Sequence, residues 1–410
     1  MLDVEKYWKK LGPGLITGAA DDDPSGIATY SQAGARYGFG LLWMAVFTFP
    51  FMAIVQEMCA RIGLVTGRGL AANIRSNYSK SVLYVCTILL FIANTFNIGA
   101  DLGAMAAGVR LLAPRANFFL LIIGFALLSL LLQIFVRYTV YARYLKYLTF
   151  TLFAYIITAF VIDTDWSTVL AHAVIPTLHW SREYLFLMCA VLGTTISPYL
   201  FFWQTGQEIQ EEIAKGDTTI KERQEDIHPR TIRAMRTDVW SGMFLSNLVM
   251  FFIIVTSAVA LSSHGITNIA SAADAATALK PFAGQWAFLL FTIGIIGTGL
   301  LAIPVLAGGT SYALSESFRL PRKSFYGVLA LSVLVGLLIN FLHIDPIKAL
   351  LYSAVLNGLI APIILFLIVR LSSNATVMGN YANGRITKTL GWIITIIMAL
   401  VGIAVIVSLI

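Results

Sequence analysis

Three consecutive acidic residues, Asp21–Asp23, interrupt an apolar stretch near the start of the chain, and Pro24 and Gly26 follow closely. Carboxylate oxygens are the ligands that hard divalent cations prefer. If the stretch crosses a membrane, each acid costs about 2.5 kcal/mol or more on insertion scales, and acids kept at that cost are typical of ion pathways. Proline removes a backbone donor and glycine loosens the chain, so we expect the helix to unwind here. The pattern predicts a cation-binding break in which Asp23 is the main ligand.

Two alternatives remain open for this cluster. The first span could be shorter than expected, with its acids in a solvated loop. If the break is real, Asp21 and Asp22 could still differ from Asp23 in role: one could face the path by which cations reach the site, or both could be solvated.

A second polar break occurs at Gly193–Tyr199, where Thr194 and Ser197 precede Pro198. The two hydroxyl residues are three apart and share one face if the segment before the proline is helical. The plainer interpretation is a proline kink whose hydroxyls bond back to the helix, which is common in membrane helices. The sequence alone leaves both interpretations open.

Histidine and cysteine add no further metal cluster. The histidines are predicted in loops or at span ends, and the cysteines fall in apolar stretches without metal-ligand or pairing spacing. They are His172, His179, His228, His264 and His343, and Cys59, Cys86 and Cys189. We also find no nucleotide-binding motif or catalytic constellation. We therefore expect neither an enzyme nor a bound cofactor.

The elements that carry these breaks must be membrane helices. The chain has 410 residues, of which 58% are hydrophobic and only 12% charged, with a mean hydropathy of +0.81. Soluble domains contain about 25% charged residues. This composition excludes a soluble enzyme, a nucleic-acid-binding protein and a disordered chain. We expect one all-α integral membrane domain over residues 1–410 that contacts the lipid bilayer and no nucleic acid. No cleavable signal peptide is expected, and the oligomeric state is not predicted.

Hydropathy predicts eleven transmembrane spans, each with about 20 mostly apolar residues. They are 12–34 (interrupted), 39–60, 82–109, 117–136, 145–162, 184–206 (interrupted), 238–261, 285–312, 325–343, 347–369 and 390–410. The mixed-charge segment between the sixth and seventh spans is expected to be a solvated loop.

The distribution of Lys and Arg supports this span count. With the N-terminus in the cytoplasm and the C-terminus outside, 22 of the 28 Lys and Arg residues lie on the cytoplasmic side and 6 lie outside. Such a bias is what the positive-inside rule requires, and one missed helix would scramble it.

The two interrupted spans occupy matching places. Spans one to five (about 12–162) and six to ten (about 184–369) form two halves, and the first span of each is broken. Interrupted spans in corresponding positions indicate a transporter binding site. The eleventh span is then an appendage.

At these breaks the sequence resembles the Nramp (SLC11) family of divalent-metal transporters. Gly12–Ile16 and Asp23–Gly26 resemble the first helix of that family, whose signature there is Asp-Pro-Gly-Asn. Gly193–Tyr199 resembles the sixth-helix signature Gly-Ala-Thr-(Val/Ile)-Met-Pro-His, and Gly309–Phe318 is similar to the end of the eighth helix. The resemblance covers nearly the whole chain. It implies a LeuT-type 5+5 inverted repeat with broken helices 1 and 6, inward metal transport and a bacterial inner membrane.

The departures from the family pattern are as informative as the matches. Asp23 keeps the metal-binding aspartate, but Gly26 replaces the asparagine, Ser197 the methionine, Thr194 the alanine that lends its carbonyl, and Tyr199 the histidine linked to proton handling. In the third span the family pattern Asp-Leu-Ala-Glu reads Asp-Leu-Gly-Ala at 101–104, so its glutamate is missing as well.

These changes favour a hard, hydrated ion. A thioether selects transition metals, and its replacement by a hydroxyl removes that preference. Mg²⁺ keeps several waters and takes one or two carboxylates, and we expect small residues at positions 26 and 197 to leave room for those waters. Loss of the histidine and glutamate would weaken a proton relay. The pattern resembles the bacterial Nramp-related magnesium transporters, so our hypothesis is import of Mg²⁺ (and Mn²⁺) without proton coupling. The predicted metal-site residues are Asp23, Gly26, Thr194, Ser197, Asp22 and Asn357.

Four other functions are alternatives to this hypothesis. They are a proton-coupled Mn²⁺/Fe²⁺ importer, an organic-solute carrier of the same fold, an intramembrane metal-dependent enzyme and a cation channel. The missing methionine and histidine argue against the first, and the acid cluster would repel a substrate carboxylate in the second. An enzyme should show several converging acids or histidines, whereas this chain offers one cluster.

Several polar residues outside the two breaks have structural explanations. Asp101 is expected to pair with Arg110 or a polar neighbour rather than to relay protons. Asn94 and Asn97 are expected to bond across the bundle. The amide of Asn357 would serve equally well in a helix–helix hydrogen bond. Two glutamates near cytoplasmic span ends, at positions 57 and 316, are expected to be solvated or ion-paired.

Overall fold

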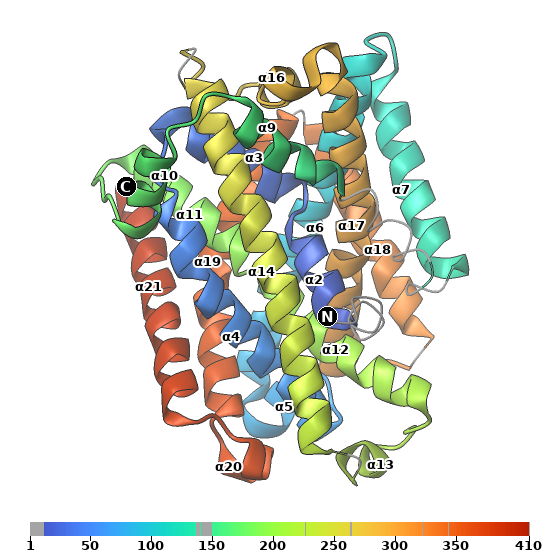
Figure 1. Cartoon of the computed structure of the whole chain (residues 1–410). Coiled ribbons are helices and arrows are strands. Elements are labelled where there is room, and N and C mark those ends of the chain that lie inside the picture. Colours follow the sequence, from blue (N-terminus) through green and yellow to red (C-terminus); the bar gives the residue numbers. More distant parts are fainter. Residues whose placement is uncertain are drawn as a thin grey trace, which may run out of the picture.

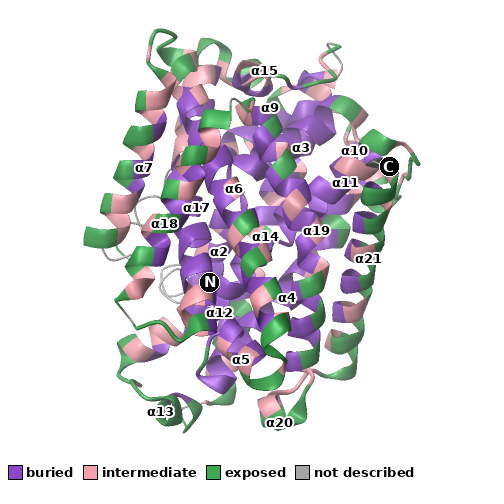
Figure 2. Cartoon of the chain, turned by 180° about the vertical axis from the view of Figure 1, so that it is seen from behind, coloured by how far each residue is buried: buried purple, intermediate pink, exposed green. Residues whose placement is uncertain are grey.

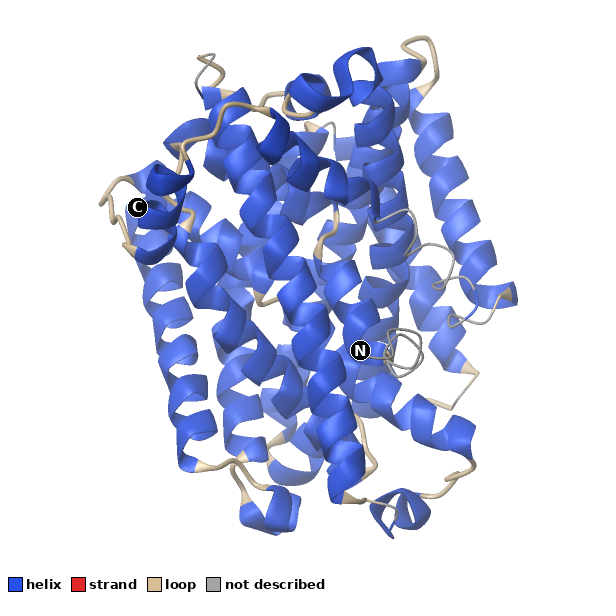
Figure 3. Cartoon of the chain, in the orientation of Figure 1, coloured by secondary structure: helices blue, strands red, loops and turns tan. Residues whose placement is uncertain are grey.

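The computed structural model describes residues 12–136, 140, 150–225, 227–262, 265–321, 323–342 and 344–409. In these residues the chain is helical, with connecting loops and no strand (Figure 3). The first part comprises α2 (Pro13–Asp21), α3 (Pro24–Tyr37), α4 (Trp43–Thr66), α5 (Leu70–Asn77), α6 (Lys80–Leu112), α7 (Phe118–Phe135), η1 (Phe150–Leu152), α9 (Phe153–Val161) and α10 (Trp166–Val174).

The second part of the chain adds the remaining helices. They are α11 (Arg182–Thr195), α12 (Pro198–Lys215), α13 (Ile220–Glu225), α14 (Pro229–Ala260), α15 (Ala272–Thr277), α16 (Lys280–Ala283), η3 (Gly284–Trp286), α17 (Ala287–Phe318), α18 (Ser324–Ile339), η4 (Asn340–Leu342), α19 (Pro346–Ser372), α20 (Ala375–Met378), η5 (Gly379–Tyr381) and α21 (Arg385–Leu409).

Both expected breaks are present. The first span is divided into α2 and α3, and the sixth into α11 and α12. In each case a proline, Pro24 or Pro198, begins the second half-helix. Proline suits this position because its missing N–H is one that the first helical turn leaves unbonded in any case. The break at Asp22–Asp23 is therefore fixed by local sequence.

Nine helical segments in the described part of the chain are long and apolar enough to cross a membrane. The first predicted span is not among them because its two half-helices have only 9 and 14 residues. The fifth prediction, 145–162, lies partly outside the described residues, and its described part is the shorter apolar segment Phe150–Val161. The other nine predicted spans each coincide with one of the nine segments.

The segment between the sixth and seventh spans is largely helical rather than a loop, whereas its expected exposure to solvent is confirmed for most residues from position 214 to position 237. Helix α12 continues to Lys215, α13 follows, and α14 begins at Pro229. Four charged residues in this region are buried: Glu208, Glu212, Arg223 and Asp238. The two spans therefore continue as polar helices that are mostly exposed, and these four charged side chains are the ones that pack inward.

The helices run between two opposite faces of the bundle (Figure 1). The lower face in this view carries α5, α13 and α20, and the upper face carries α16 together with α15, which Figure 2 labels. Exposed residues lie on the peripheral helices and buried residues fill the centre (Figure 2), and the exposed residues of α7 include the apolar Leu120, Leu127 and Phe135. Only 17% of the residues in the apolar stretch of α7 are buried, against 94% in the apolar stretch of Arg182–Lys215. The second broken helix therefore lies inside the bundle, where unwound backbone is shielded from lipid.

Candidate cation site at the two helix breaks

Asp23 occupies the N-cap position of α3. Its Oδ1 accepts hydrogen bonds from the backbone N–H of Gly26 at 2.8 Å and from the Ser25 hydroxyl at 2.6 Å. Aspartate is favoured at an N-cap because its carboxylate satisfies an unbonded N–H and faces the positive end of the helix dipole. Only 1% of the residue is exposed. The Asp-Pro-Ser-Gly sequence thus orients a buried carboxylate at the first break.

The second carboxylate oxygen of Asp23 is held by another helix. Asn97 Nδ2 on α6 donates to Asp23 Oδ2 at 3.0 Å, and Asn97 Oδ1 accepts from the Ser353 hydroxyl of α19 at 2.9 Å. The expected cross-bundle role of Asn97 is confirmed, but its partner is the predicted ion ligand itself. Helices α6 and α19 therefore help to position Asp23, in addition to its own helix.

The two breaks meet at Thr194. The hydroxyls of Ser25 and Thr194 are 3.3 Å apart, joining the start of α3 to the end of α11. A Cβ atom added at Gly26 would lie 3.3 Å from Thr194 Oγ1 and from the Asp21 carbonyl oxygen. A side chain at position 26 would therefore be tightly packed in this arrangement, and the expectation that a small residue here leaves room for waters stays a prediction.

Ser197 lies at the start of α12, within the second break. Its hydroxyl donates to the carbonyl oxygens of Gly193 at 2.7 Å and Thr194 at 2.9 Å. This is the back-bonding that the plainer interpretation of the sequence describes. Because the proton is engaged, the hydroxyl oxygen remains an acceptor, and oxygen acceptors suit hard cations.

Asp21 and Asp22 do not lie in a solvated loop. Both are buried, and the Ser246 hydroxyl of α14 shares its proton between Asp21 Oδ2, at 2.8 Å, and Asp22 Oδ1, at 3.2 Å. Asp21 Oδ1 has no hydrogen-bond partner among the described residues. The three acids at the first break therefore bond to two different helices: Asp23 to α6, and Asp21 and Asp22 to α14.

Two further buried side chains have unbonded polar atoms. Both amide atoms of Asn357 and both carboxylate oxygens of Asp101 lack a hydrogen-bond partner within the described part of the chain. The expected pairing of Asp101 with Arg110 or a polar neighbour is therefore wrong. The helix–helix hydrogen bond considered for Asn357 is also not formed. Buried polar atoms without partners are uncommon and call for a ligand or a water.

Tyr199 occupies the position at which the Nramp pattern has a histidine. It is buried, and its hydroxyl donates to the carbonyl of Ala20 at 3.1 Å. This bond ties the first turn of α12 to the last turn of α2. Asn94, the other polar residue expected to bond across the bundle, donates to the Thr310 hydroxyl and the Leu306 carbonyl of α17.

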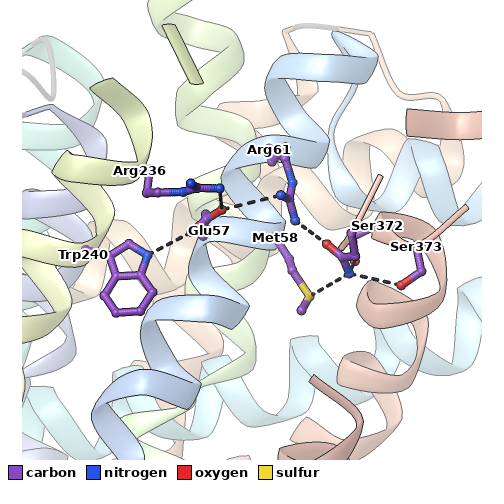
Figure 4. Close-up of polar contacts among 8 residues, drawn as sticks. Glu57, Met58, Arg61, Arg236, Trp240, Ser372 and Ser373 are labelled. Carbon is purple, nitrogen blue, oxygen red and sulfur yellow. Dashed lines mark hydrogen bonds and ion pairs between the residues drawn. The ribbon is translucent and has the colours of Figure 1, made fainter. Parts of the chain in front are cut away.

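The two other glutamates singled out in the sequence are bound to structural partners. Glu57 accepts from Arg236 at 2.8 Å and from Trp240 Nε1 at 2.9 Å, and Arg61 lies 3.5 Å away (Figure 4). Glu316 accepts from the backbone N–H of Ala72 at 3.0 Å, near the start of α5. The ion pairing expected at Glu57 is confirmed, although its carboxylate is buried rather than solvated.

No group of three or more His, Cys, Asp or Glu residues suited to a metal converges in the described part of the chain. A cation at Asp23 would therefore take most of its ligands from hydroxyls, amides, carbonyls and water. That donor set fits Mg²⁺, which retains waters and uses few carboxylates.

A bundle of membrane helices in which two broken helices meet at a buried carboxylate is the architecture of a secondary transporter. The family model described as "Natural resistance-associated macrophage protein-like" (Nramp) matches residues 14–408. The chain belongs to the Nramp family.

Its relatives are transporters rather than enzymes. The divalent metal cation transporter MntH of Klebsiella pneumoniae subsp. pneumoniae is 27% identical over 407 residues, covering 96% of this chain and 92% of the relative. MntH of Klebsiella pneumoniae strain 342 is also 27% identical, over 95% of this chain and 91% of its own length. The interpretation as an intramembrane enzyme is thereby excluded.

Solved structures share the fold. The manganese transporter of Eremococcus coleocola, in complex with an aromatic bis-isothiourea compound, matches with a TM-score of 0.81 and 19% identity, covering 98% of this chain and 88% of that one. Mhp1, a nucleobase-cation-symport-1 family transporter, matches with a TM-score of 0.60 and 14% identity, over 97% and 91% of the two chains.

Proposed function

We propose that this chain imports divalent metal cations, Mg²⁺ first and Mn²⁺ second, by alternating access and without proton coupling. The observation that carries the proposal is that the polar groups around the Asp23 carboxylate are oxygen and nitrogen atoms. Its carboxylate is bonded to Ser25, Gly26 and Asn97, and the adjoining break supplies the Thr194 and Ser197 hydroxyls. A site of this composition lacks the soft ligand that would favour transition metals.

The remaining site assignments are part of the same proposal. Asp23 is the direct or water-mediated ligand, and Thr194 and Ser197 contribute oxygen atoms from the second break. Asn357 has two unbonded amide atoms to offer the ion or its waters. Asp22 supplies a second negative charge beside the break. Because Gly26 is closely packed, the waters that Mg²⁺ keeps require the two breaks to separate slightly when the ion binds.

The absence of proton coupling is inferred from two replacements. A tyrosine hydroxyl has an ordinary pKa near 10 and does not exchange protons readily at neutral pH, unlike a histidine. Tyr199 also donates its proton to a carbonyl, which cannot return one. Position 104 is an alanine instead of an acid. Two charges moving inward gain about 4.6 kcal/mol per 100 mV of membrane potential, so no further driving ion is required.

The proposed topology has eleven spans in two inverted five-helix halves of the LeuT type, followed by one appended helix. The N-terminus would be cytoplasmic, the C-terminus external, and the membrane the bacterial inner membrane. The lower face of Figure 1 is then the cytoplasmic face, since the connections rich in Lys and Arg include α5 and α13.

The second candidate is a proton-coupled importer of Mn²⁺ or Fe²⁺. Two observations favour it. The structural neighbour from Eremococcus coleocola is a manganese transporter. In addition, the thioether of Met250 on α14 accepts a hydrogen bond from Thr195 Oγ1 at 3.8 Å, which brings a sulfur atom next to the second break.

Flux into liposomes separates these candidates. The purified protein is reconstituted, and Mg²⁺, Mn²⁺ or Ca²⁺ is supplied separately under an inside-negative potential, with an internal pH dye in each case. We expect Mg²⁺ uptake without internal acidification. Acidification that tracks metal uptake would support the proton-coupled candidate, and absence of Mg²⁺ uptake would overturn the magnesium assignment. An Asp165→Asn variant serves as the control, because this residue is exposed and remote from both breaks.

A further inference from the structure

The first turn of α2 is held by an acidic side chain from a distant part of the sequence. Asp238 Oδ1 accepts from the backbone N–H groups of Gly12, at 2.8 Å, and Leu15, at 3.2 Å, and Asp238 Oδ2 accepts from that of Gly14 at 2.6 Å. These N–H groups have no partner within their own helix. No residue of α2 itself caps this end by a side-chain bond, so the carboxylate of α14 does so instead.

Beyond this contact, toward the break, α2 and α14 touch through their main chains. A Cβ atom added at Gly18 would lie 2.2 Å from the carbonyl oxygen of Gly242, and one added at Gly242 would lie 2.1 Å from the carbonyl oxygen of Gly14. Small residues permit such close approach between membrane helices. The nine-residue half-helix therefore rests directly on α14 along its length.

A third contact joins α2 to the other broken helix. Thr17 Oγ1 donates to Gln204 Oε1 at 2.5 Å, and Gln204 Nε2 donates to Glu208 Oε1 at 2.8 Å, all within α2 and α12. These residues are buried. The lower side of the break is thus closed by α2, which is held by α14 on one side and α12 on the other.

The upper half of the same helix is held separately. Gln32 on α3 accepts from the backbone N–H of Ile269 at 2.8 Å and donates to the Thr267 carbonyl at 3.2 Å. The chain between α2 and α3 is non-helical at Asp22 and Asp23. Because separate contacts hold the two half-helices and non-helical backbone joins them, α2 can move away from α14 while α3 stays in place.

We propose that Asp238 is a positioning residue of the transport cycle: its carboxylate holds α2 against α14, closing the site from the lower face, and this bond breaks when the site opens to that face. The inference deepens the proposed function, since it assigns the step at which alternating access exposes Asp23 to the lower face. Loss of the carboxylate should shift the protein toward the state open at the lower face.

Thiol labelling tests the proposal without metal flux. The buried Cys59, Cys86 and Cys189 are replaced, and a single cysteine is introduced either by Ala20→Cys, on α2, or by Thr29→Cys, on α3. Each reporter is labelled with a hydrophilic maleimide in detergent, in the parent and with Asp238→Ala added. We expect labelling of the α2 reporter to accelerate about tenfold or more, because hydrogen bonds to a charged group are lost, and labelling of the α3 reporter to slow or stay unchanged.

Two comparisons guard against a trivial result. Asp165→Ala removes an aspartate that accepts backbone N–H bonds at the start of its own helix, α10, and it should change neither reporter. Asp238→Asn keeps one acceptor oxygen and the side-chain volume, so it should give an intermediate rate. An unchanged α2 reporter in Asp238→Ala would overturn the proposal. If both reporters accelerate equally in Asp238→Ala, that variant has unfolded, and the test then rests on Asp238→Asn. Labelling of the α2 reporter at the parent rate in Asp238→Asn would also overturn the proposal. Wild-type Mg²⁺ uptake, measured separately, reports on the proposed function alone.

Discussion

The amide of Asn97 donates a 3.0 Å hydrogen bond to Asp23 Oδ2, while the other carboxylate oxygen is bonded at the start of its own helix. The carboxylate is therefore oriented by two helices that approach it from different sides. Orientation before the ion arrives removes part of the entropy cost of binding. The site is built around one fixed carboxylate rather than a cage of acids.

Removing this support should weaken ion binding more than turnover. Asn97→Ala is expected to raise the apparent KM for Mg²⁺ uptake by roughly three- to tenfold, in keeping with a lost hydrogen bond to a charged group, with a smaller change in maximal rate. The matched control is Asn94→Ala on the same helix, whose partners are on α17 and not at Asp23. Uptake kinetics in liposomes measure both, and equal KM values for the two variants would contradict a positioning role.

Ligand chemistry at the second break should set selectivity. Ser197→Met restores a thioether, so we expect the ratio of Mn²⁺ to Mg²⁺ uptake to rise about tenfold. Ser197→Leu adds comparable volume without sulfur and should not raise that ratio. A combined change at Gly26 is avoided because its Cα is already closely packed. Competition of the two ions in one uptake assay measures the ratio, and an equal rise with leucine would assign the effect to volume.

The close contact of α2 with α14 predicts a large cost for one added methyl group. In Gly18→Ala the new Cβ would meet a main-chain oxygen at 2.2 Å, which cannot be relieved by a side-chain rotation. Overpacking of this kind costs about 1–3 kcal/mol. Gly124→Ala on α7 is the control, since no atom lies within 4 Å of its Cβ position. Thermal unfolding followed by size-exclusion chromatography should show a lower midpoint only for Gly18→Ala.

The buried ion pair at the lower face should be important for stability. Glu57→Gln leaves the guanidinium of Arg61, whose side chain is 7% exposed, without its opposite charge. Breaking a buried pair costs about 3–5 kcal/mol. The exposed pair of Lys221 and Glu225 offers a control, and Glu225→Gln should change the unfolding midpoint very little. A double variant, Glu57→Gln with Arg61→Gln, should recover part of the loss, and failure of either comparison would refute this assignment.

The sequence predicted the positions of both breaks because local residue types determine them. Proline at the first position of α3 and α12, together with acids or hydroxyls just before it, specifies an unwound turn without reference to distant residues. The same holds for the long apolar spans. Each of these features is encoded within a window shorter than one helix.

Features that depend on helix rotation and register were not predictable in this way. Asn97 could be expected to bond across the bundle, but nothing in its sequence neighbourhood names Asp23 as the partner. Asp238 stands at the predicted start of the seventh span beside a mixed-charge segment, and nothing there indicates that its partners are backbone groups 223 to 226 residues away. The unbonded carboxylate of Asp101 likewise follows from packing and not from composition.

The most direct test of the central claim is Mg²⁺ uptake by Asp23→Asn in liposomes loaded with a Mg²⁺-sensitive dye, under an inside-negative potential. Asparagine caps a helix as well as aspartate, so α3 and the thermal unfolding midpoint should be preserved while the negative charge is lost. We predict that uptake falls at least about 100-fold, which corresponds to the loss of a charged ligand worth about 2.7 kcal/mol. Uptake within twofold of the wild-type rate, by a protein of unchanged stability, would contradict the assignment of Asp23 as the ion ligand.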